Sequence, residues 1–484
     1  MIDWLSDAAG IFRTKNFIKA GSGTYSFEEI NKKANYIAHY LKEKYSLKQE
    51  DVAAILSENN IEFIILVFAL WKSGAIPVPL NTRLNESETN HLITFLKPSF
   101  IFADTTANRD LGYKDAKSIP IAFDFSMFEK PDISDCYFDE NGTALILFTS
   151  GTSGNPKGVQ LSFHNLKASF ENSDTVLKHN ANDSWIASLP FYHIGGFSII
   201  TRALLSGTSI IIPKSPKAED LAESIEMHRP SYISIVSTQL RRLIDLGIKP
   251  WTELKYVLLG GGHIEDSLVD EAINIGWPIA KVYGSTETSS LITFVDCIKD
   301  NNKKSSGGKP LVNNQIFTVN ERKEILQPNN VGEIAIKSES CARGYYNNPF
   351  ESKNKFRDGI YYTGDAGFID EEGYLYINSR IGDLIISGGE NINPVEIETA
   401  LIEHPEVLHA AVFGQEDNEW GQVVLAAVII DPGSDISEKE LKEFLLRKIS
   451  SFKIPRRFYF MKEFPISPLG KIQKDKLKDL VRNY

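Results

Sequence analysis

Strand patterns and helix patterns take turns along the first 300 residues of this 484-residue chain, and this alternation constrains its fold most strongly. The spacing of apolar residues predicts a buried strand over 52–56, a helix over 61–73 that ends before Gly74, and a second strand over 75–80. Strands that alternate with helices favour an α/β fold built on parallel sheets. Further strands, each near a helical stretch, are predicted over 143–148, 209–212, 232–235 and 256–259.

The pattern changes after about residue 300, which indicates a second kind of structure. A polar loop leads into short strands predicted over 316–320 and 332–337 and into a hairpin over 367–378. The last hundred residues mix helices and strands again. Because a single core stops growing near roughly 250–300 residues, we expect at least two domains, with the boundary near 379–383.

Local signals mark the starts of several helices. Ser26 with Glu29, and Ser437 with Glu440, have the spacing of a capping box, in which each side chain binds the other residue's backbone N–H. A further helix is predicted to follow Pro394, because proline is favoured in the first turn of a helix.

Composition narrows the classes of protein that the chain can belong to. It has 52 basic and 63 acidic side chains and a formal net charge of −11, which argues against nucleic-acid binding through a broad basic surface. Cys136, Cys297 and Cys341 lack metal-ligand spacing and are expected to be free thiols. The N-terminal segment contains acidic residues where a signal peptide has basic ones. The apolar run 64–71 is too short to cross a bilayer. We therefore expect a soluble cytoplasmic enzyme.

The strongest single motif is a glycine-, serine- and threonine-rich loop at 149–158 that ends in Lys157-Gly158. Its glycines let backbone N–H groups turn toward an anion, its hydroxyls add donors, and Lys157 adds a positive charge. It follows a predicted strand and is expected to precede a helix, which favours phosphate binding. It is not a Walker A loop, because the spacing of that motif is absent. A solvated Gly/Ser loop is the alternative.

Two more polar or glycine-rich segments follow predicted strands. In 283–288, Glu287 is a candidate Mg²⁺ ligand, because this ion prefers oxygen and accompanies nucleotide phosphates, although serine and threonine there could simply cap a helix. The triple glycine that includes Gly261 and Gly262 could let a flat ligand lie on the backbone or could be a flexible loop. In parallel α/β folds, ligands bind at the carboxyl ends of strands.

Three single residues are weaker candidates on their own. His193, between aromatic residues and glycines, could form a pocket wall or be structural. Asp365 could accept hydrogen bonds from ribose hydroxyls or sit in a turn. Lys471 lies in a proline- and glycine-containing loop near the end of the chain, where an ordinary surface lysine is the alternative.

Taken in order, these segments resemble the adenylate-forming superfamily, which includes acyl-CoA and aryl-CoA synthetases, and the resemblance covers essentially the whole chain. It implies that Tyr283 stacks on adenine, that Thr286 contacts the α-phosphate, and that Glu287 serves Mg²⁺. It also implies that Lys471 is the catalytic lysine and that His193 gates the acyl pocket. The nucleotide-binding residues implied are Thr149, Ser150, Gly151, Thr152, Ser153, Gly154, Lys157, Gly261, Gly262, Tyr283, Gly284, Asp365 and Arg380.

The resemblance also implies a fold and a two-step reaction. The expected fold is a large N-terminal domain over 1–380, with two α/β subdomains and a β-barrel at about 300–380, and a small mobile α+β domain over 383–484. A carboxylate first attacks ATP to give an acyl-adenylate, and the small domain then rotates about a hinge near Gly382. CoA forms the thioester in the second step, and Gly388 and Gly389 would let its pantetheine arm pass close to the backbone.

Within the superfamily, the chain is most similar to the o-succinylbenzoate–CoA ligases of menaquinone biosynthesis, on the segments 188–202, 234–240 and 383–392. In that family an arginine nine residues after the histidine helps to hold the substrate's second carboxylate, and Arg202 stands there. Gly195 replaces a common serine, and Ser198 or Ser237 are the candidates to compensate.

Three functions remain open from the sequence. The first is ligation of 2-succinylbenzoate to CoA, the second is ligation of a monocarboxylate of the fatty or benzoic acid type, and the third is nucleotide binding without catalysis. The expected ligands are ATP, Mg²⁺, CoA and a small carboxylate, with no nucleic acid and no membrane span, and a homo-oligomer is compatible with the sequence.

Overall fold

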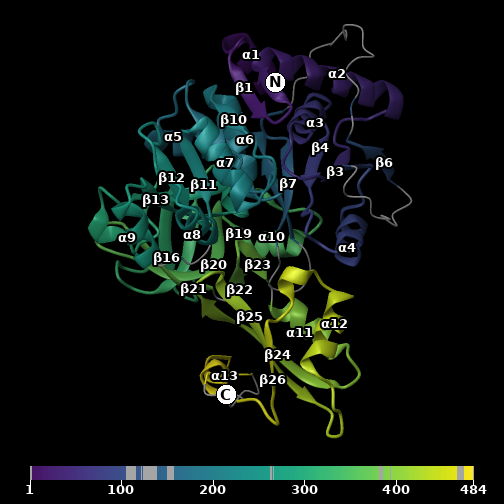
Figure 1. Cartoon of the computed structure of the whole chain (residues 1–484), viewed down its shortest axis with the longest axis vertical. Helices are drawn as coiled ribbons and strands as arrows, with labels where there is room; N and C mark the ends of the chain where they lie inside the picture. The colour runs from purple at the N-terminus through teal and green to yellow at the C-terminus, as the bar shows by residue number, and fades with distance from the viewer. Residues whose placement is uncertain are drawn as a thin grey trace.

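The structure is a computed structural model, and it describes residues 3–104, 116–121, 123, 139–149, 157–261, 264, 266–380, 385–392, 394–465, 472 and 474–482. In Figure 1 the chain begins in the upper, purple part of a large body, and its last hundred residues form a smaller body below it. The predicted capping boxes at Ser26 and Ser437 are both present. Of the predicted free cysteines, Cys297 and Cys341 form no disulfide, and Cys136 lies outside the described residues.

A nine-stranded sheet forms the centre of the large body. Its strands are, in spatial order, β15 (Lys309–Pro310), β14 (Ser290–Asp296), β13 (Ile279–Ser285), β12 (Tyr256–Leu259), β11 (Tyr232–Ile235), β9 (Ser184–Ile186), β10 (Ser209–Ile211), β1 (Asn16–Ala20) and β2 (Gly23–Ser26). The strands from β13 to β1 pair in parallel, and β14, β15 and β2 are antiparallel additions at the edges. The parallel strands direct their carboxyl ends to one edge, where ligands bind in such folds.

A second, four-stranded parallel sheet completes the predicted pair of α/β subdomains. Its order is β4 (Ile76–Pro79), β3 (Val52–Leu56), β5 (Phe100–Ala103) and β6 (Lys117–Pro120). The bounds of β3 are those predicted from its apolar run.

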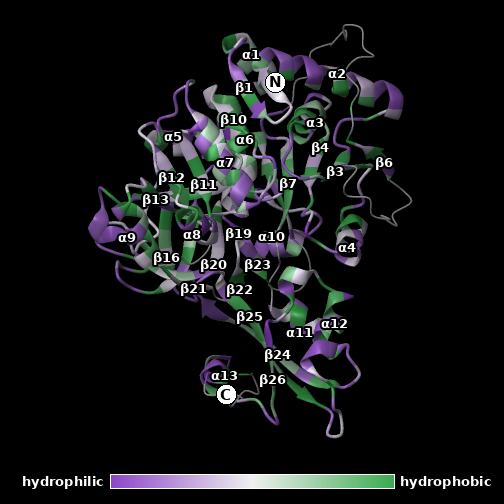
Figure 2. Ribbon diagram, in the orientation of Figure 1, coloured by the Kyte–Doolittle hydropathy of each residue, from purple (hydrophilic) through white to green (hydrophobic). Residues whose placement is uncertain are grey.

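Helices cover the faces of these sheets. In the large body they are α1 (Trp4–Ile11), α2 (Phe27–Tyr45), α3 (Ile61–Lys72), α4 (Glu86–Leu96), α5 (Phe163–Leu177), α6 (Ile194–Ser206), α7 (Ala218–His228), α8 (Ser237–Asp245), α9 (Asp266–Asn274) and α10 (Pro349–Lys355), with 3₁₀ turns η2 (Thr286–Thr288) and η3 (Asn301–Lys303). Every residue of α3 except Glu62 is buried, which explains its continuous apolar run. Figure 2 shows apolar residues gathered along the strands and inner helix faces. In the part of the chain that the structure describes, no helix is long and apolar enough to cross a membrane.

Two antiparallel sheets adjoin the α/β core. One contains β18 (Gly344–Tyr345), β8 (Lys157–Ser162) and β7 (Thr143–Thr149), and the other contains β16 (Gln315–Val319), β17 (Gly332–Lys337), β20 (Ile360–Ile369), β19 (Phe356–Arg357) and β21 (Leu375–Arg380). The order of the second sheet does not close on itself, so the predicted β-barrel is an open half-barrel in the described residues.

The small body has its own sheet and its own core. The sheet order is β23 (Glu390–Ile392), β22 (Ile385–Ser387), β25 (Gly421–Ile430) and β24 (Val407–Asp417), with β26 (Arg457–Phe460) paired to β25. Its helices are α11 (Pro394–Ile402), α12 (Glu438–Leu446) and α13 (Lys474–Val481), with the 3₁₀ turn η4 (Ser451–Lys453). Residues such as Ile385, Val412 and Leu441 form a hydrophobic cluster separate from those of the large body.

Candidate active site

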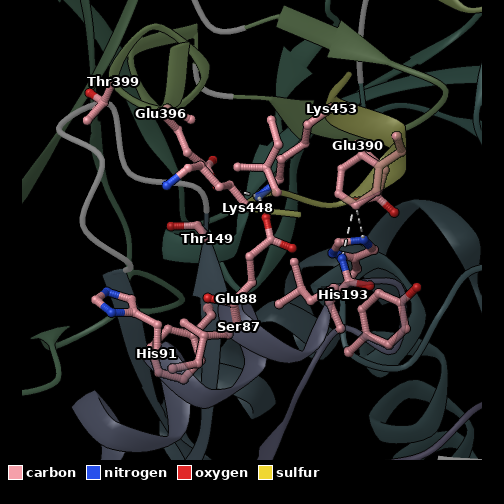
Figure 3. A pocket seen from close by; sticks show the side chains of 18 of the residues that line it. Ser87, Glu88, His91, Thr149, His193, Glu390, Glu396, Thr399, Lys448 and Lys453 are labelled. Atoms are coloured by element: carbon pink, nitrogen blue, oxygen red, sulfur yellow. Dashed lines mark hydrogen bonds and ion pairs between the residues drawn. The ribbon is translucent and has the colours of Figure 1, made fainter. Parts of the chain in front are cut away.

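A cavity of about 550 Å³ lies between the large and small bodies. The large body contributes Thr149 at the end of β7, His193 at the start of α6, and Thr286 in η2. The small body contributes Glu390 at the start of β23 and Lys453 in η4. Figure 3 labels Thr149, His193, Glu390 and Lys453, whose side chains come from both bodies and surround one space. The structure therefore brings together three sequence-predicted residues and two that sequence reasoning did not assign a role.

Tyr283 and Asp365, both predicted to hold the nucleoside, are in direct contact. The Tyr283 hydroxyl donates to Asp365 Oδ2 at 2.6 Å, which joins the end of β13 to β20. Arg380 pairs with Asp365 across β20 and β21, so its backbone lies at the same place. An aromatic ring beside a buried carboxylate is suited to a base stacked on the ring and a ribose that donates to the carboxylate.

Glu287 is held with one carboxylate oxygen engaged. The Tyr345 hydroxyl donates to Glu287 Oε1 at 2.9 Å, and the side chain is buried. No group of three or more His, Cys, Asp or Glu side chains that could bind a metal occurs in the described part of the chain. One oxygen-bearing side chain fits Mg²⁺ only where nucleotide phosphates and water supply the remaining ligands, which is the common arrangement for this ion.

The phosphate-type loop differs from its predicted setting. Lys157 begins β8, which folds back antiparallel on β7, and Thr149 pairs with Lys157. The predicted strand–loop–helix is therefore wrong: the loop joins two strands of a hairpin, and α5 begins only at Phe163. Lys157 Nζ lies 2.6 Å from Glu351 Oε1, so a carboxylate of α10 neutralises this buried lysine.

His193 contacts the small body through Glu390. His193 Nε2 lies 3.4 Å from Glu390 Oε2, and Arg83 donates to Glu390 Oε1 at 3.1 Å. Burial acts to raise the pKa of Glu390, but His193 and Arg83 outweigh it and hold the pKa below its usual value. Glu390 is thus a buried carboxylate of the small body that two basic residues of the large body stabilise as an anion.

The predicted glycines Gly388 and Gly389 form the turn between β22 and β23, with φ of +57° and +83°. A Cβ on Gly389 would lie 3.3 Å from Val236, and a Cβ on Gly261 would lie 3.4 Å from the same side chain. A Cβ on Gly388 would lie 2.7 Å from the ring of Trp420. Two glycine turns, one from each body, therefore meet at Val236, and the absence of side chains lets both backbones approach it closely.

Trp420 lies at the same junction between two arginines. The guanidinium of Arg242, in α8, is 5.6 Å from the ring centroid, and that of Arg456 is 5.5 Å away. Cation–π attraction of this kind holds the ring between the large body and the small one.

The three predicted carboxylate-binding residues have different surroundings. Arg202, in α6, is 2% exposed and donates to Ser290 Oγ at 3.2 Å, and its Nε has no partner. Ser198 Oγ donates to the Gly195 carbonyl at 3.1 Å and lies 3.4 Å from Ser290 Oγ. Ser237 begins α8. In the described residues no carboxylate lies within ion-pair distance of Arg202, and burial lowers its pKa to about 9.

His179 lies close enough to Arg202 for the charge of the arginine to affect the pKa of the histidine. Its side chain is buried, Nδ1 is 2.7 Å from Asp174 Oδ1, and Nε2 has no partner. Burial is the main cause that lowers the pKa of His179 to about 4; the charge of Arg202 also acts to lower the pKa, and Asp174 acts to raise it. Trp185 lies 5.8 Å from the His179 ring and 5.7 Å from the Arg202 guanidinium.

A second ionic contact joins the two bodies on the other side of the cavity. Lys453 Nζ lies 2.8 Å from Glu88 Oε1 in α4 and 2.8 Å from Glu396 Oε1 in α11. Ser450 also donates to Glu88. Burial acts to lower the pKa of Lys453, but the two carboxylates raise it above its usual value. Figure 3 shows Glu88 pointing from the large body toward Lys453.

Several predicted residues lie outside the described part of the chain, and others were missed. Those outside are Ser150, Gly151, Thr152, Ser153, Gly154, Gly262, Gly382 and Lys471. Missed residues are Arg83, Glu88, Ser290, Glu390 and Lys453. Glu390 follows a predicted glycine turn and could have been inferred from it, whereas the other four carry no local sequence signal.

Comparison with known proteins follows the same division of the chain. Residues 6–346 match the AMP-binding enzyme family, and residues 396–471 match the AMP-binding enzyme C-terminal domain. Among curated proteins, a 2-succinylbenzoate–CoA ligase of Bacillus licheniformis is 33% identical over 98% of this chain and 99% of its own length. One from Bacillus subtilis is 31% identical over 99% of this chain and 97% of its own length.

Two solved structures of o-succinylbenzoate CoA synthetase from Bacillus subtilis, each 30% identical over 99% of this chain and 98% of its own, differ in their similarity to it. A double mutant bound with its product analogue OSB-NCoA gives a TM-score of 0.93. The complex with the acyl-adenylate intermediate OSB-AMP gives 0.76. The identities are equal, so the difference lies in the arrangement of the chain, and this structure has the arrangement of the product-analogue complex.

Proposed function

Because this chain belongs to the AMP-binding enzyme family and is an adenylate-forming CoA ligase, we propose that its carboxylate substrate is 2-succinylbenzoate. The product would be 2-succinylbenzoyl-CoA, which places the reaction in menaquinone biosynthesis. Curated relatives of nearly the same length that carry this activity support the proposal.

Arg202 is the observation that carries the choice of substrate. A fully buried guanidinium with no carboxylate partner in the described residues is costly, because an ion taken out of water needs a compensating charge. 2-Succinylbenzoate has two carboxylates, of which only one reacts. The other supplies the missing anion, and Arg202 can bind it through two parallel N–H donors. A fatty or benzoic acid has no group to fill that role.

In the first step a carboxylate oxygen of the substrate attacks the α-phosphorus of ATP, and the bond to pyrophosphate breaks. Tyr283 and Asp365 hold the adenosine, Arg380 contacts the ribose, and Thr149, Lys157 and Gly284 belong to the walls around the phosphates. Lys157 leaves Glu351 to bind a phosphate oxygen. Thr286 donates to the α-phosphate, where negative charge builds up in the transition state.

Glu287 is the residue that would hold Mg²⁺, and the ion supplies charge neutralisation for the ATP phosphates. Lys471 bridges the substrate carboxylate and the α-phosphate and so fixes the angle of attack. Replacement of Lys471 by alanine is expected to abolish adenylate formation while CoA transfer from a supplied acyl-adenylate persists.

The arrangement of the two bodies suits the second step. Glu390 engages His193, and the Gly388-Gly389 turn and Gly261 both approach Val236. We place the pantetheine arm beside these glycines, where no side chain hinders its approach to the backbone. The CoA thiol attacks the acyl carbon, and AMP departs. The higher similarity to the product-analogue complex supports this assignment. We further propose domains at 1–380 and 383–484, joined by a hinge near 379–383.

A CoA-ligation assay tests the proposed substrate. The purified protein with ATP, Mg²⁺ and CoA is offered 2-succinylbenzoate, benzoate and a series of fatty acids, and AMP and thioester are measured. We expect turnover with 2-succinylbenzoate that exceeds the others by at least about 100-fold in kcat/KM, since the others leave Arg202 unpaired. Good turnover of a monoacid beside none of 2-succinylbenzoate would refute the proposal.

A further inference from the structure

Ser290 occupies a position between the nucleotide site and the buried arginine. It begins β14, separated by one residue from the end of η2, the turn that carries Thr286 and Glu287. Three residues therefore separate the cavity-lining Thr286 from a side chain that touches Arg202. The segment that carries Thr286 therefore also carries a side chain in contact with Arg202.

The backbone at Ser290 is held in a conformation that side chains rarely adopt. Its φ is +101°, and Ser289 before it has a φ of +55°. The Thr288 hydroxyl donates to the Ser290 carbonyl at 2.8 Å, and a Cβ on Gly284 would lie 1.9 Å from that same carbonyl oxygen. Only glycine at 284 permits this approach, so two strands cooperate to fix an unfavourable geometry. Observed strain of this kind is concentrated at functional sites.

The hydroxyl of Ser290 has an unused proton. Arg202 donates to Ser290 Oγ at 3.2 Å, and the single hydroxyl proton of Ser198 points either to the Gly195 carbonyl at 3.1 Å or to Ser290 Oγ at 3.4 Å. A serine hydroxyl accepts two hydrogen bonds and donates one. In the described residues no bond uses the proton of Ser290, which leaves one O–H donor beside the unpartnered Nε of Arg202. Two unused donors next to each other, one of them cationic, match a carboxylate.

We propose that Ser290 is a specificity-determining residue that donates a hydrogen bond to the substrate carboxylate that does not react, which Arg202 holds. This assignment rests on the proposed function, because it needs a substrate with two carboxylates. The Arg202–Ser290 contact orients both donors before the substrate arrives.

The test compares substrates with and without the second carboxylate. Ser290→Ala is assayed with 2-succinylbenzoate and with 4-oxo-4-phenylbutanoate and 2-butyrylbenzoate, each of which lacks one of its carboxylates. Each monoacid keeps one of the two carboxylates of 2-succinylbenzoate. The monoacid that the wild type accepts therefore identifies the carboxylate that reacts. We expect kcat/KM for 2-succinylbenzoate to fall about 10- to 100-fold, mainly through KM, because a hydrogen bond to a charged group is lost. Turnover of the accepted monoacid should stay within about twofold.

Two further variants separate the hydroxyl from the backbone. Ser290→Gly also removes the hydroxyl but relieves the positive φ, so the same selective loss is expected from it, and it provides a folded protein if the alanine variant is unstable. Ser289→Ala is the matched control, because its hydroxyl donates to the Ser340 carbonyl at 2.7 Å and not toward Arg202. This control should keep the wild-type ratio between dicarboxylate and monoacid.

The outcomes also distinguish the two proposals. If the wild type ligates 2-succinylbenzoate and Ser290→Ala reduces both substrates equally, or reduces neither, the role of Ser290 is overturned and the proposed function stands. If the wild type does not ligate 2-succinylbenzoate, both the proposed function and the proposed role of Ser290 are refuted.

Discussion

Two buried cations of this protein have opposite surroundings. Lys453, at the junction of the two bodies, is 7% exposed and has a carboxylate on each side at 2.8 Å. Arg202, inside the large body, is 2% exposed and contacts the neutral hydroxyl of Ser290 and the ring of Trp185, with no carboxylate partner among the described residues. A cation with its counter-charges in place stabilises the contact that supplies them, whereas a cation without one is prepared for an anion from outside. The contrast distinguishes a domain contact from a ligand site.

The largest expected effect comes from removing the unpaired cation. In Arg202→Met, kcat/KM for 2-succinylbenzoate should fall at least about 100-fold, equivalent to about 3 kcal/mol, because a buried charge-assisted contact with the substrate is lost. Turnover of the accepted monoacid should change less than about threefold. Steady-state kinetics with both substrates check this.

The same variant tests whether Arg202 also supports the fold. Since methionine removes a buried, uncompensated charge, the free energy of unfolding should be unchanged or higher, as measured by urea denaturation. A loss of several kcal/mol would mean that Arg202 has a structural partner, and the comparison with Lys453 would fail.

The lowered pKa of His179, to which the charge of Arg202 contributes, makes the free energy of unfolding depend on pH. Its pKa is about 4 in the folded protein and near 6.5 when unfolded, so the unfolded chain binds more protons between these values. Stability contributed by the neutral imidazole is therefore present above pH 6.5 and lost as the pH falls toward 4, by about 3 kcal/mol. In His179→Gln this loss should vanish, as measured by urea unfolding at several pH values.

The charge of Arg202 helps to lower the pKa of His179. The acid stability of the protein therefore tests whether Arg202, unlike Lys453, lacks a counter-charge. In Arg202→Met the pKa of His179 should move up toward its usual value, and the acid loss of stability should shrink. An unchanged pKa in an NMR titration of His179 would show that the charge of Arg202 is already compensated.

The smaller effect comes from the paired cation. Lys453→Met removes the partner of Glu88 and Glu396 and should weaken the contact between the bodies by about 2 kcal/mol, because two partly buried carboxylates lose their counter-charge. Thioester formation should slow by about 30-fold, while adenylate formation should be maintained. Single-turnover measurement of each half-reaction checks the split.

Lys448→Met is the matched control for this variant. Lys448 pairs with Glu403 within the small body. Both side chains are more than a third exposed, at 35% for Lys448 and 55% for Glu403. Exposed pairs contribute little, so both half-reactions should stay within about twofold. Equal slowing of the two half-reactions by Lys453→Met would argue against a role in the arrangement of the bodies.

Sequence reasoning succeeded where the signal is local. The capping boxes at Ser26 and Ser437 and the apolar run of β3 depend on neighbours in the chain, and all are present. It failed after the glycine-rich loop, which was expected to precede a helix but is followed by strand β8, because β8 is defined by its partners β7 and the distant β18. The α/β class and the two bodies follow from repeated local patterns, so the overall fold was predictable.

The site was only partly predictable for the same reason. The motif residues Tyr283 and Asp365 were named separately, and the structure places them 2.6 Å apart. The contacts of Arg83 with Glu390 and of Lys453 with Glu88 join residues 307 and 365 positions apart, which no local pattern encodes. Ser290 was missed because its role depends on backbone geometry and on the proximity of Arg202.

Trp420 gives this molecule an internal optical probe. Its indole touches Gly388 and lies between Arg242 of the large body and Arg456 of the small one. If the small body turns between the two steps, the indole leaves Arg242 and its emission spectrum changes. The turning rate can then be followed in the unlabelled protein by stopped-flow fluorescence, separately from the chemistry.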